Sequence, residues 1–327
     1  MPAQAKNKTN ILITSAGRRG YLIRYFKEAL GNKGKVFAAD CSRYSPAIYD
    51  ADKYFIVPEV LHKDYVKNLL DICIKNKIRG IFSVHDLELP ILAKNKKIFS
   101  QKNIEVIVSN PEVIDICYDK YKTFLFLKRN GFMTPKTFIS VHEALKEIKK
   151  KTLSFPLLIK AKKGCASMGI KKVYNAKQLQ NEFNRKTDII QEFIVGEEYG
   201  IDFFNNKDGM PIAIFIKKKI QMRSGETDKA LTVYDKNLIE IVKKLGKKLG
   251  SYGPTDADVL KQGSRYLFID INPRFGGGYP LARAAGADFP AKIISLVNKE
   301  NLKPDYKRYP ANILMMKQHE IVIKKMK

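Results

Sequence analysis

Short apolar runs alternate with amphipathic stretches along the first third of the chain. The apolar runs, at 10–14, 35–40, 53–58, 78–84 and 104–109, predict strands. Between them, segments 20–30 and 63–77 place apolar residues three and four positions apart, the spacing of a helix that buries one face. Alternating strands and helices indicate a parallel α/β sheet, so a Rossmann-like domain is expected here.

The pattern changes after Pro111 to a mixture of helices and hairpin strands. A helix is expected to end at the turn Asn130-Gly131, and residues 155–174 indicate a strand, a glycine-containing loop and a second strand. Further strands are expected within 188–204, 211–222, 253–260 and 265–274, with a helix at 238–250. This part of the chain is therefore expected to be α+β.

Composition argues for a globular protein of two or three packed units. The chain has 327 residues, 45% of them hydrophobic, and no run approaches the roughly 20 apolar residues of a membrane span. The first ten residues are polar and lead directly into a strand, which does not indicate a signal peptide. The four cysteines form no CxxC pair, so a zinc site is not expected. A reducing, cytoplasmic location is expected.

The formal charge of +27 raises the question of nucleic acid. The lysines are spread over nearly every segment, and no nucleic-acid-binding signature lies among them. A solvated lysine-rich surface is favoured, and attraction to anionic partners or substrates remains the alternative.

Polar residues follow two of the apolar runs in the first third. The turn TSAGRRGY lacks a full GxGxxG, so a tight strand-to-helix turn and a ligand contact both stay open. The segment HDLEL follows another strand end, where substrate contact and a capping role for Asp86 are the alternatives. The candidate substrate residues are Ser15, Gly17, Arg18, His85, Asp86 and Glu88.

The strand RYLFIDIN carries polar groups at its end. Because side chains two apart share a face of a strand, Asp270 and Asn272 are expected to project together with Phe268, and Ile269 and Ile271 to fill the opposite side. Carboxylate and amide oxygens are hard ligands suited to Mg²⁺. This strand therefore predicts part of a metal site, with Arg274 beside it.

A second strand, GPTDADVL, repeats this geometry with Asp256 and Asp258 on one face. If the two strands are adjacent and antiparallel, Asp258 comes opposite Asp270 and Asn272. The alternative is a set of surface acids paired with the abundant lysines. A buried acid cluster without a cation would be costly, since like charges repel.

The order of these pieces resembles the ATP-grasp superfamily over nearly the whole chain. The strand ending in Asp-x-Asn-Pro-Arg follows both a strand-loop-strand unit with Lys160 and the segment QEFIVGEEY. SAGRRGYLIRYF, HDLELP, DKYKTF and INPRFGGGYPLARAAGADFP resemble single-module relatives of the carbamoyl phosphate synthetase large subunit.

The resemblance implies a role for particular residues. ATP would be bound by Lys120, Lys160, Gly164, Ser167, Met168, Gly169, Glu192, Phe193, Ile194 and Glu198. Mg²⁺ or Mn²⁺ would be held by Asp258, Asp270 and Asn272. Lys160 and Arg274 would be the catalytic residues, Arg274 stabilising the transferring phosphoryl group.

This sequence departs from the family pattern at four positions. Asp270 replaces the commoner Glu, and Asp258 stands where carbamoyl phosphate synthetases have Gln. Ala161 replaces a proline, and Cys165 lies in the phosphate loop. These changes affect the prediction of turnover more than that of ATP binding.

The resemblance implies a Rossmann-like N-terminal domain followed by a two-subdomain ATP-grasp fold. The expected units are residues 1–115, a small subdomain at 116–188, a large subdomain at 189–300 and a C-terminal extension at 301–327. Lys219 and Arg223, on and after a strand, are candidates to grip an acidic substrate, and a solvated basic edge is the alternative.

The function implied is an ATP-dependent ligase that joins a small-molecule carboxylate to an amine through an acylphosphate. A bicarbonate- or carboxylate-phosphorylating enzyme and a non-catalytic nucleotide-binding protein remain as alternatives, and a homodimer is one open arrangement.

Overall fold

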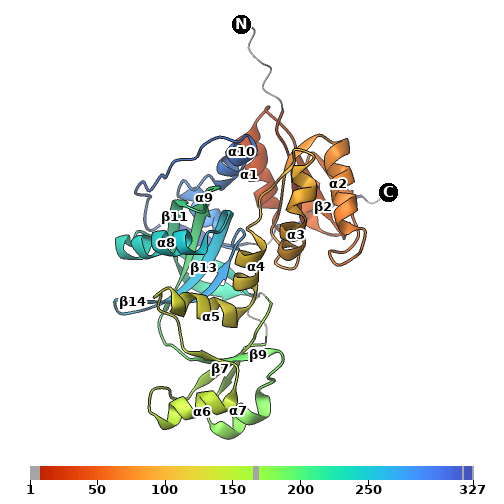
Figure 1. The fold of residues 1–327 in the computed structure, drawn as a ribbon. Coiled ribbons are helices and arrows are strands. Elements are labelled where there is room, and N and C mark those ends of the chain that lie inside the picture. Colours follow the sequence, from red (N-terminus) through yellow and green to blue (C-terminus); the bar gives the residue numbers. More distant parts are fainter. Residues whose placement is uncertain (1–7, 165–168, 319, 326–327) are drawn as a thin grey trace.

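The computed structural model describes residues 8–164, 169–318 and 320–325. An N-terminal α/β domain lies beside a large antiparallel sheet, and a small lobe projects away from both (Figure 1). The expected combination of a parallel-sheet domain with two antiparallel units is confirmed. In the described part of the chain, no helix has the length and apolar character needed to cross a membrane.

The N-terminal sheet is parallel, with the strand order β3-β2-β1-β4-β5. Its elements are β1 (Asn10–Thr14), α1 (Gly20–Leu30), β2 (Val36–Asp40), the 3-10 helix η1 (Pro46–Asp50), β3 (Lys53–Ile56), α2 (Tyr65–Lys75), β4 (Ile78–Ser83), α3 (Leu89–Ser100) and β5 (Glu105–Val106). The last strand is shorter than the expected 104–109. The chain order reverses between β1 and β4, so their carboxyl ends form a topological switch point.

Helices from distant parts of the sequence cover the two faces of this sheet. Leu12 faces a core shared with residues of α2 and α3. Ile11 and Ile13 face the other core, which contains residues of α1 and of α10 (Phe289–Val297). Figure 1 shows α1 and α10 side by side. A helix from the far end of the chain therefore completes the N-terminal domain.

The small lobe is a sheet with the order β6-β9-β7-β8, and two helices pack on it. Its elements are β6 (Thr137–Phe138), α6 (Val141–Lys149), β7 (Leu157–Ala161), β8 (Lys171–Val173), α7 (Ala176–Glu182) and β9 (Asp188–Glu192). β7 and β8 form the expected hairpin. The boundary between the small and large subdomains was expected between residues 188 and 189, where β9 begins. Because β9 pairs with β7, the small sheet extends to Glu192.

The large sheet is antiparallel, with the order β14-β13-β10-β11-β12-β15. Its elements are β10 (Glu197–Asn205), β11 (Pro211–Arg223), β12 (Glu226–Val233), α8 (Lys236–Leu249), β13 (Gly253–Gln262), β14 (Arg265–Asn272), α9 (Tyr279–Ala284) and β15 (Leu314–Met316). α8, α4 (Pro111–Tyr118) and α5 (Lys120–Arg129) contribute to the core on one face of the sheet. The opposite face carries the polar residues of the site.

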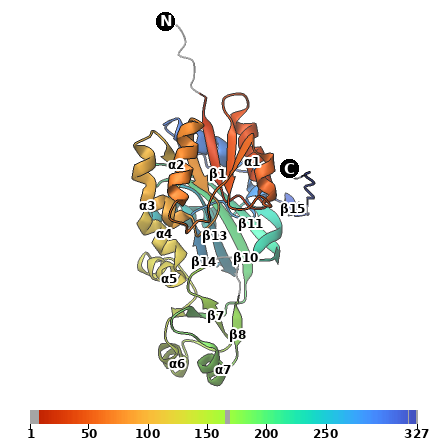
Figure 2. The same cartoon turned by 90° about the vertical axis from the view of Figure 1, so that its right-hand side faces the viewer.

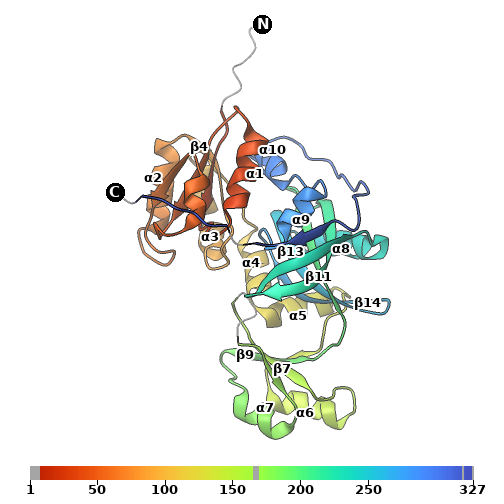
Figure 3. The same ribbon diagram turned by 180° about the vertical axis from the view of Figure 1, so that it is seen from behind.

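The segment expected as a C-terminal extension is part of the fold. β15 pairs with β12 at the edge of the large sheet. Beyond it the chain reaches the N-terminal domain, where Glu320 forms an ion pair with Arg24 of α1 at 3.1 Å. Figures 2 and 3 show this end of the chain passing from β15 toward the N-terminal domain. The C-terminal segment thus joins two domains.

Candidate functional site

A cavity of about 620 Å³ lies at the switch point, where the N-terminal domain meets the large sheet. Ligands of open α/β sheets bind at such a place, beyond the carboxyl ends of the strands. Among the residues that line it are Ser15, Gly17, Arg18, His85, Asp86 and Arg223, which the sequence marked as substrate candidates. The C-terminal segment adds Met316 and Lys317 to the wall. We refer to this space as the switch-point cavity.

Glu88 lies elsewhere than the sequence suggested. Its side chain is fully buried, and its carboxylate accepts hydrogen bonds from the hydroxyls of Thr14 (2.6 Å), Tyr65 (2.7 Å), Ser15 (2.8 Å) and Ser83 (2.5 Å). These partners include the ends of β1 and β4. Glu88 directly precedes α3, and its side chain makes no capping hydrogen bond with that helix. Glu88 therefore holds the cavity wall together and does not line the cavity.

Arg274 connects the switch-point cavity to the large sheet. Its Nε and Nη2 donate to Asp86 Oδ1 (2.8 Å) and Oδ2 (3.1 Å), and its Nη1 lies 3.9 Å from Asp256 Oδ2. Burial opposes the charge of Arg274, but Asp86 and Asp256 outweigh it and raise the pKa of the guanidinium. Arg274 therefore remains charged between a cavity residue and a sheet residue.

Acidic and amide side chains face one another across β13 and β14. Asp258 is opposite Asp270, as expected, and Asp256 is opposite Asn272. Burial raises the pKa of Asp258 and of Asp256. These residues form an oxygen-rich group on the open face of the large sheet.

Lys219 lies in this group. Its Nζ is 2.6 Å from Asp258 Oδ1 and 2.8 Å from Glu198 Oε1, and its side chain is 5% exposed. Burial acts against its charge, but Asp258 and Glu198 outweigh burial and raise the pKa of Lys219. Lys219 was a candidate to grip an acidic substrate, with a solvated basic edge as the alternative. The structure pairs it with Asp258, a proposed metal ligand, and with Glu198, which the resemblance assigns to ATP binding.

Lys217 is a site residue that the sequence reasoning missed. Its Nζ lies 2.5 Å from Asp202 and 3.9 Å from Asp256, and both Lys217 and Asp202 are buried. Gly200 makes room for this cation, because a Cβ there would come within 2.8 Å of Lys217 Cε. The two-residue period of a strand could have identified Lys217, since it shares a face with Lys219.

A β-bulge corrects the expected pattern along β14. Val259 pairs with Phe268 and Asp258 with Asp270, so Ile269 is an extra residue between two pairs. As a result Phe268 packs in the same core as Ile271, and not on the face of Asp270. The expectation that Phe268 would share the polar face, with Ile269 in the core, was wrong because regular alternation does not continue through a bulge.

Two of the basic residues that the resemblance assigns to ATP come from different parts of the fold, Lys120 from α5 and Lys160 from β7 of the small lobe. Lys120 Nζ donates to the carbonyl of Gly164 at 2.8 Å, so the first residue of α5 contacts the start of the loop after β7. Lys160 Nζ donates to Gln191 Oε1 at 2.8 Å, and burial lowers the pKa of Lys160. Gln191 is a second residue missed from the sequence, where nothing marked its amide as a partner for Lys160. Of the loop itself, Cys165, Ser167 and Met168 lie outside the described residues.

The segment between β9 and β10 joins the two lobes. Glu192 Oε2 accepts from the backbone N–H of Lys136 at 3.0 Å, and the Lys172 ammonium lies 3.7 Å from the ring centroid of Phe193. Ile194 is half-buried. Glu192, Phe193 and Ile194, which the resemblance assigns to ATP binding, therefore lie at the junction between the lobes.

The oxygen atoms of the oxygen-rich group have the chemistry that suits a hard cation. Asp258, Asp270 and Asn272 provide two carboxylates and an amide within two adjacent strands, which is chemistry that Mg²⁺ or Mn²⁺ accepts. In the described residues, no group of three or more His, Cys, Asp or Glu side chains is placed to hold a metal by itself. A cation here would take its remaining ligands from phosphate oxygens and water.

The arrangement defines a two-lobed nucleotide-binding protein with a Rossmann-like domain at its N-terminal end. Residues 117–278 match the family described as the ATP-grasp domain, and residues 11–107 match the PylC-like N-terminal domain. The chain belongs to the ATP-grasp superfamily.

Individual proteins show the same likeness. The chain is 24% identical to a formate-dependent phosphoribosylglycinamide formyltransferase of Wigglesworthia glossinidia brevipalpis, over 83% of this chain and 71% of the relative. It is 22% identical to the carbamoyl phosphate synthase large chain of Clostridium beijerinckii, over 83% of this chain but only 26% of that protein. The crystal structure of a biotin carboxylase–β-γ-ATP complex from Campylobacter jejuni superposes with a TM-score of 0.73 at 17% identity, over 95% of this chain and 75% of the other.

Proposed function

We propose that this chain is an ATP-dependent carboxylate–amine ligase that acts on small molecules. Membership of the ATP-grasp superfamily supports this proposal, as does the likeness to a carbamoyl phosphate synthase and to a biotin carboxylase crystallised as a β-γ-ATP complex. The observation that carries it is the position of Arg274, which lines the switch-point cavity and also approaches Asp256 on the large sheet. The guanidinium of Arg274 therefore borders both the switch-point cavity and the oxygen-rich group.

ATP would lie between the small lobe and the large sheet. Lys120 and Lys160 would bind its phosphates, with Gly164, Ser167, Met168 and Gly169 in the loop that covers them. Glu192, Phe193 and Ile194 would bind the adenine, and Glu198 the ribose. Mg²⁺ or Mn²⁺ would be held by Asp258, Asp270 and Asn272, and would neutralise phosphate charge.

The reaction follows from this placement. A carboxylate oxygen of the substrate attacks the γ-phosphorus of ATP, the bond to the β–γ bridging oxygen breaks, and ADP leaves. The guanidinium of Arg274 would stabilise charge on the transferring group. The acylphosphate then has a leaving group that the carboxylate lacked. An amine attacks its carbonyl carbon, phosphate leaves, and the nitrogen loses a proton.

The experiment is a coupled assay of ADP release with pairs of small carboxylates and amines, and with bicarbonate as a separate arm. ADP release that requires a carboxylate, with phosphate and an amide as co-products once an amine is added, is the expected result. Asp270→Asn provides the inactive control. ADP release with bicarbonate alone would favour the phosphorylating alternative, and ATP binding without turnover on any pair would contradict the ligase.

A further inference from the structure

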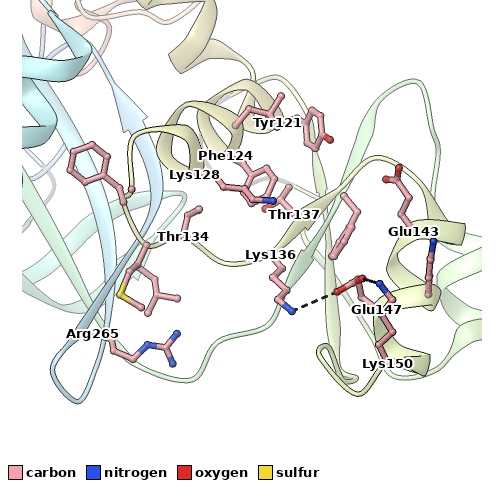
Figure 4. Close-up of a pocket in the computed structure, with 17 residues that line it drawn as sticks. Tyr121, Phe124, Lys128, Thr134, Lys136, Thr137, Glu143, Glu147, Lys150 and Arg265 are labelled. Carbon is pink, nitrogen blue, oxygen red and sulfur yellow. Dashed lines mark hydrogen bonds and ion pairs between the residues drawn. The ribbon is translucent and has the colours of Figure 1, made fainter.

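A second cavity, of about 730 Å³, lies between α5 and α6, at the junction of the small lobe with the rest of the chain. The segment between α5 and β6 crosses it, and the start of β14 closes one side (Figure 4). As far as the chain is described, its lining includes none of the residues assigned to ATP, metal or substrate. We call it the α5–α6 groove.

One wall of the α5–α6 groove is apolar. Tyr121 and Phe124 present their rings from α5, with centroids 5.9 Å apart, and Leu267 lines the β14 side. Leu125 and Met133 remain 39% and 41% exposed here. Large apolar side chains left open around a concave surface are characteristic of ligand sites.

The rim of the groove is basic. Its basic residues are Lys128, Lys136, Lys146, Lys150 and Arg265, and its acidic residues are Glu143 and Glu147. Figure 4 shows Arg265 on the β14 side of the opening and Lys150 on the α6 side.

The two acids do not balance these cations. Glu147 already pairs with Lys150 at 3.1 Å and approaches Lys136 at 3.9 Å. Lys128, Lys146 and Arg265 have no acidic partner among the described residues. The excess charge around the apolar wall is therefore positive.

We propose that the α5–α6 groove is a second ligand site, for a small amphipathic anion with an aromatic or aliphatic body and a carboxylate, sulfonate or phosphate group. The apolar wall matches the body of such a molecule, and the unpaired cations match its charged end. The volume lies in the range of small-molecule pockets, roughly 300 to 1,000 Å³. Because the groove and the proposed ATP site have separate linings, both can be filled at once.

The probe is 8-anilinonaphthalene-1-sulfonate, an aromatic sulfonate that fluoresces in apolar surroundings. It is titrated into the full chain with and without saturating MgATP. The groove variant is Lys128→Glu/Lys146→Glu. Its matched control is Arg129→Glu/Lys149→Glu, which makes the same change in charge. Arg129 follows Lys128 in α5, and Lys149 lies three residues after Lys146 in α6, but neither lines the groove.

Saturable binding that persists with MgATP is expected for the wild type. The groove variant should lose at least about tenfold in probe affinity, equivalent to about 1.4 kcal/mol, and the control should change less than about twofold. Leu125→Asp should reduce binding as well. Equal losses in the two double variants, or displacement of the probe by MgATP, would overturn the proposal. ATP affinity is measured separately, so a failure of the ligase proposal remains distinguishable.

Discussion

Asp86 and Arg274 are 188 residues apart in sequence, yet they form a bidentate ion pair with N···O distances of 2.8 and 3.1 Å. Their side chains are only 14% and 10% exposed. The pair joins the end of β4 in the N-terminal domain to the end of β14 in the large sheet.

The first prediction concerns the stability of this pair. Asp86→Ala and Arg274→Ala should each lower the free energy of unfolding by about 3 kcal/mol or more, because each removes one half of a largely buried bidentate ion pair. The double variant should lose clearly less than the sum of the two. Urea denaturation of the four proteins in a double-mutant cycle measures this coupling, and additive losses would contradict it.

Turnover separates two roles of Arg274. If its guanidinium stabilises the transferring phosphoryl group, Arg274→Ala should keep MgATP binding but slow ADP release far more than Asp86→Ala does. If Arg274 acts only by joining the domains, the two variants should slow turnover equally. A comparison of single-turnover rates decides between these outcomes.

Lys160→Ala should weaken ATP binding by about tenfold or more while the chain stays folded. Burial lowers the pKa of Lys160, so carrying this charge costs stability, and its removal should not lower the melting temperature. Lys171→Ala is the control, since Lys171 lies in the neighbouring strand β8 and forms an exposed pair with Glu182. Calorimetric titration with ATP measures both. Unchanged affinity in folded Lys160→Ala would exclude a phosphate contact.

Substitutions along β14 should separate chemistry from packing. Asp270→Asn keeps the volume and should preserve the fold but lower metal-dependent ADP release by orders of magnitude. Ile271→Ala should cost about 2 to 5 kcal/mol as a core truncation. Ile269→Ala should cost much less, because the bulge leaves Ile269 outside that core. Thermal melts and ADP release distinguish the three, and near-normal activity of Asp270→Asn would rule this acid out as a ligand.

The pH dependence of stability provides a test at Glu226, which lines the switch-point cavity. Burial acts to raise the pKa of Glu226, but Arg19 at 3.1 Å and Lys317 at 2.9 Å outweigh it and lower the pKa to about 2. A lowered carboxyl pKa stabilises the fold above the ordinary value of about 4.3, and this contribution is lost as pH falls toward 2.

Glu226→Gln should therefore be less stable than the wild type at pH 7, by at most about 2 kcal/mol because solvent screens a side chain that is 35% exposed. The difference should shrink between about pH 4 and pH 2. Denaturation at several pH values measures it, and a constant difference would show that the ion pairs do not stabilise the fold.

Much of the fold could be predicted from the sequence. Short apolar runs identified β1 to β4, and a strand-loop-strand pattern identified the hairpin of β7 and β8. Apolar residues spaced three and four apart identified α1 and α2, because each of these helices buries one face. The opposition of Asp258 and Asp270 was also predictable, since both strands carry polar residues two positions apart on one face.

Other features depend on tertiary structure. The bulge at Ile269 interrupts alternation without any glycine to mark it. Glu88 resembles its polar neighbours in HDLEL, and only the hydroxyls that surround it show that it is buried. The pairing of Lys219 with Asp258 joins strands separated by β10, which a local pattern does not reveal.

The packing of α10 against α1 has a consequence for synthesis on the ribosome. Translation releases β1 and α1 first, but the core that they share with Phe289 and Ile293 cannot close until those residues have left the exit tunnel. The N-terminal domain, although its strands are continuous in sequence, must therefore persist with one apolar face open through most of elongation. Nascent chains stalled before α10 should be more sensitive to protease in α1 than chains stalled after it, and should recruit chaperones until that helix arrives.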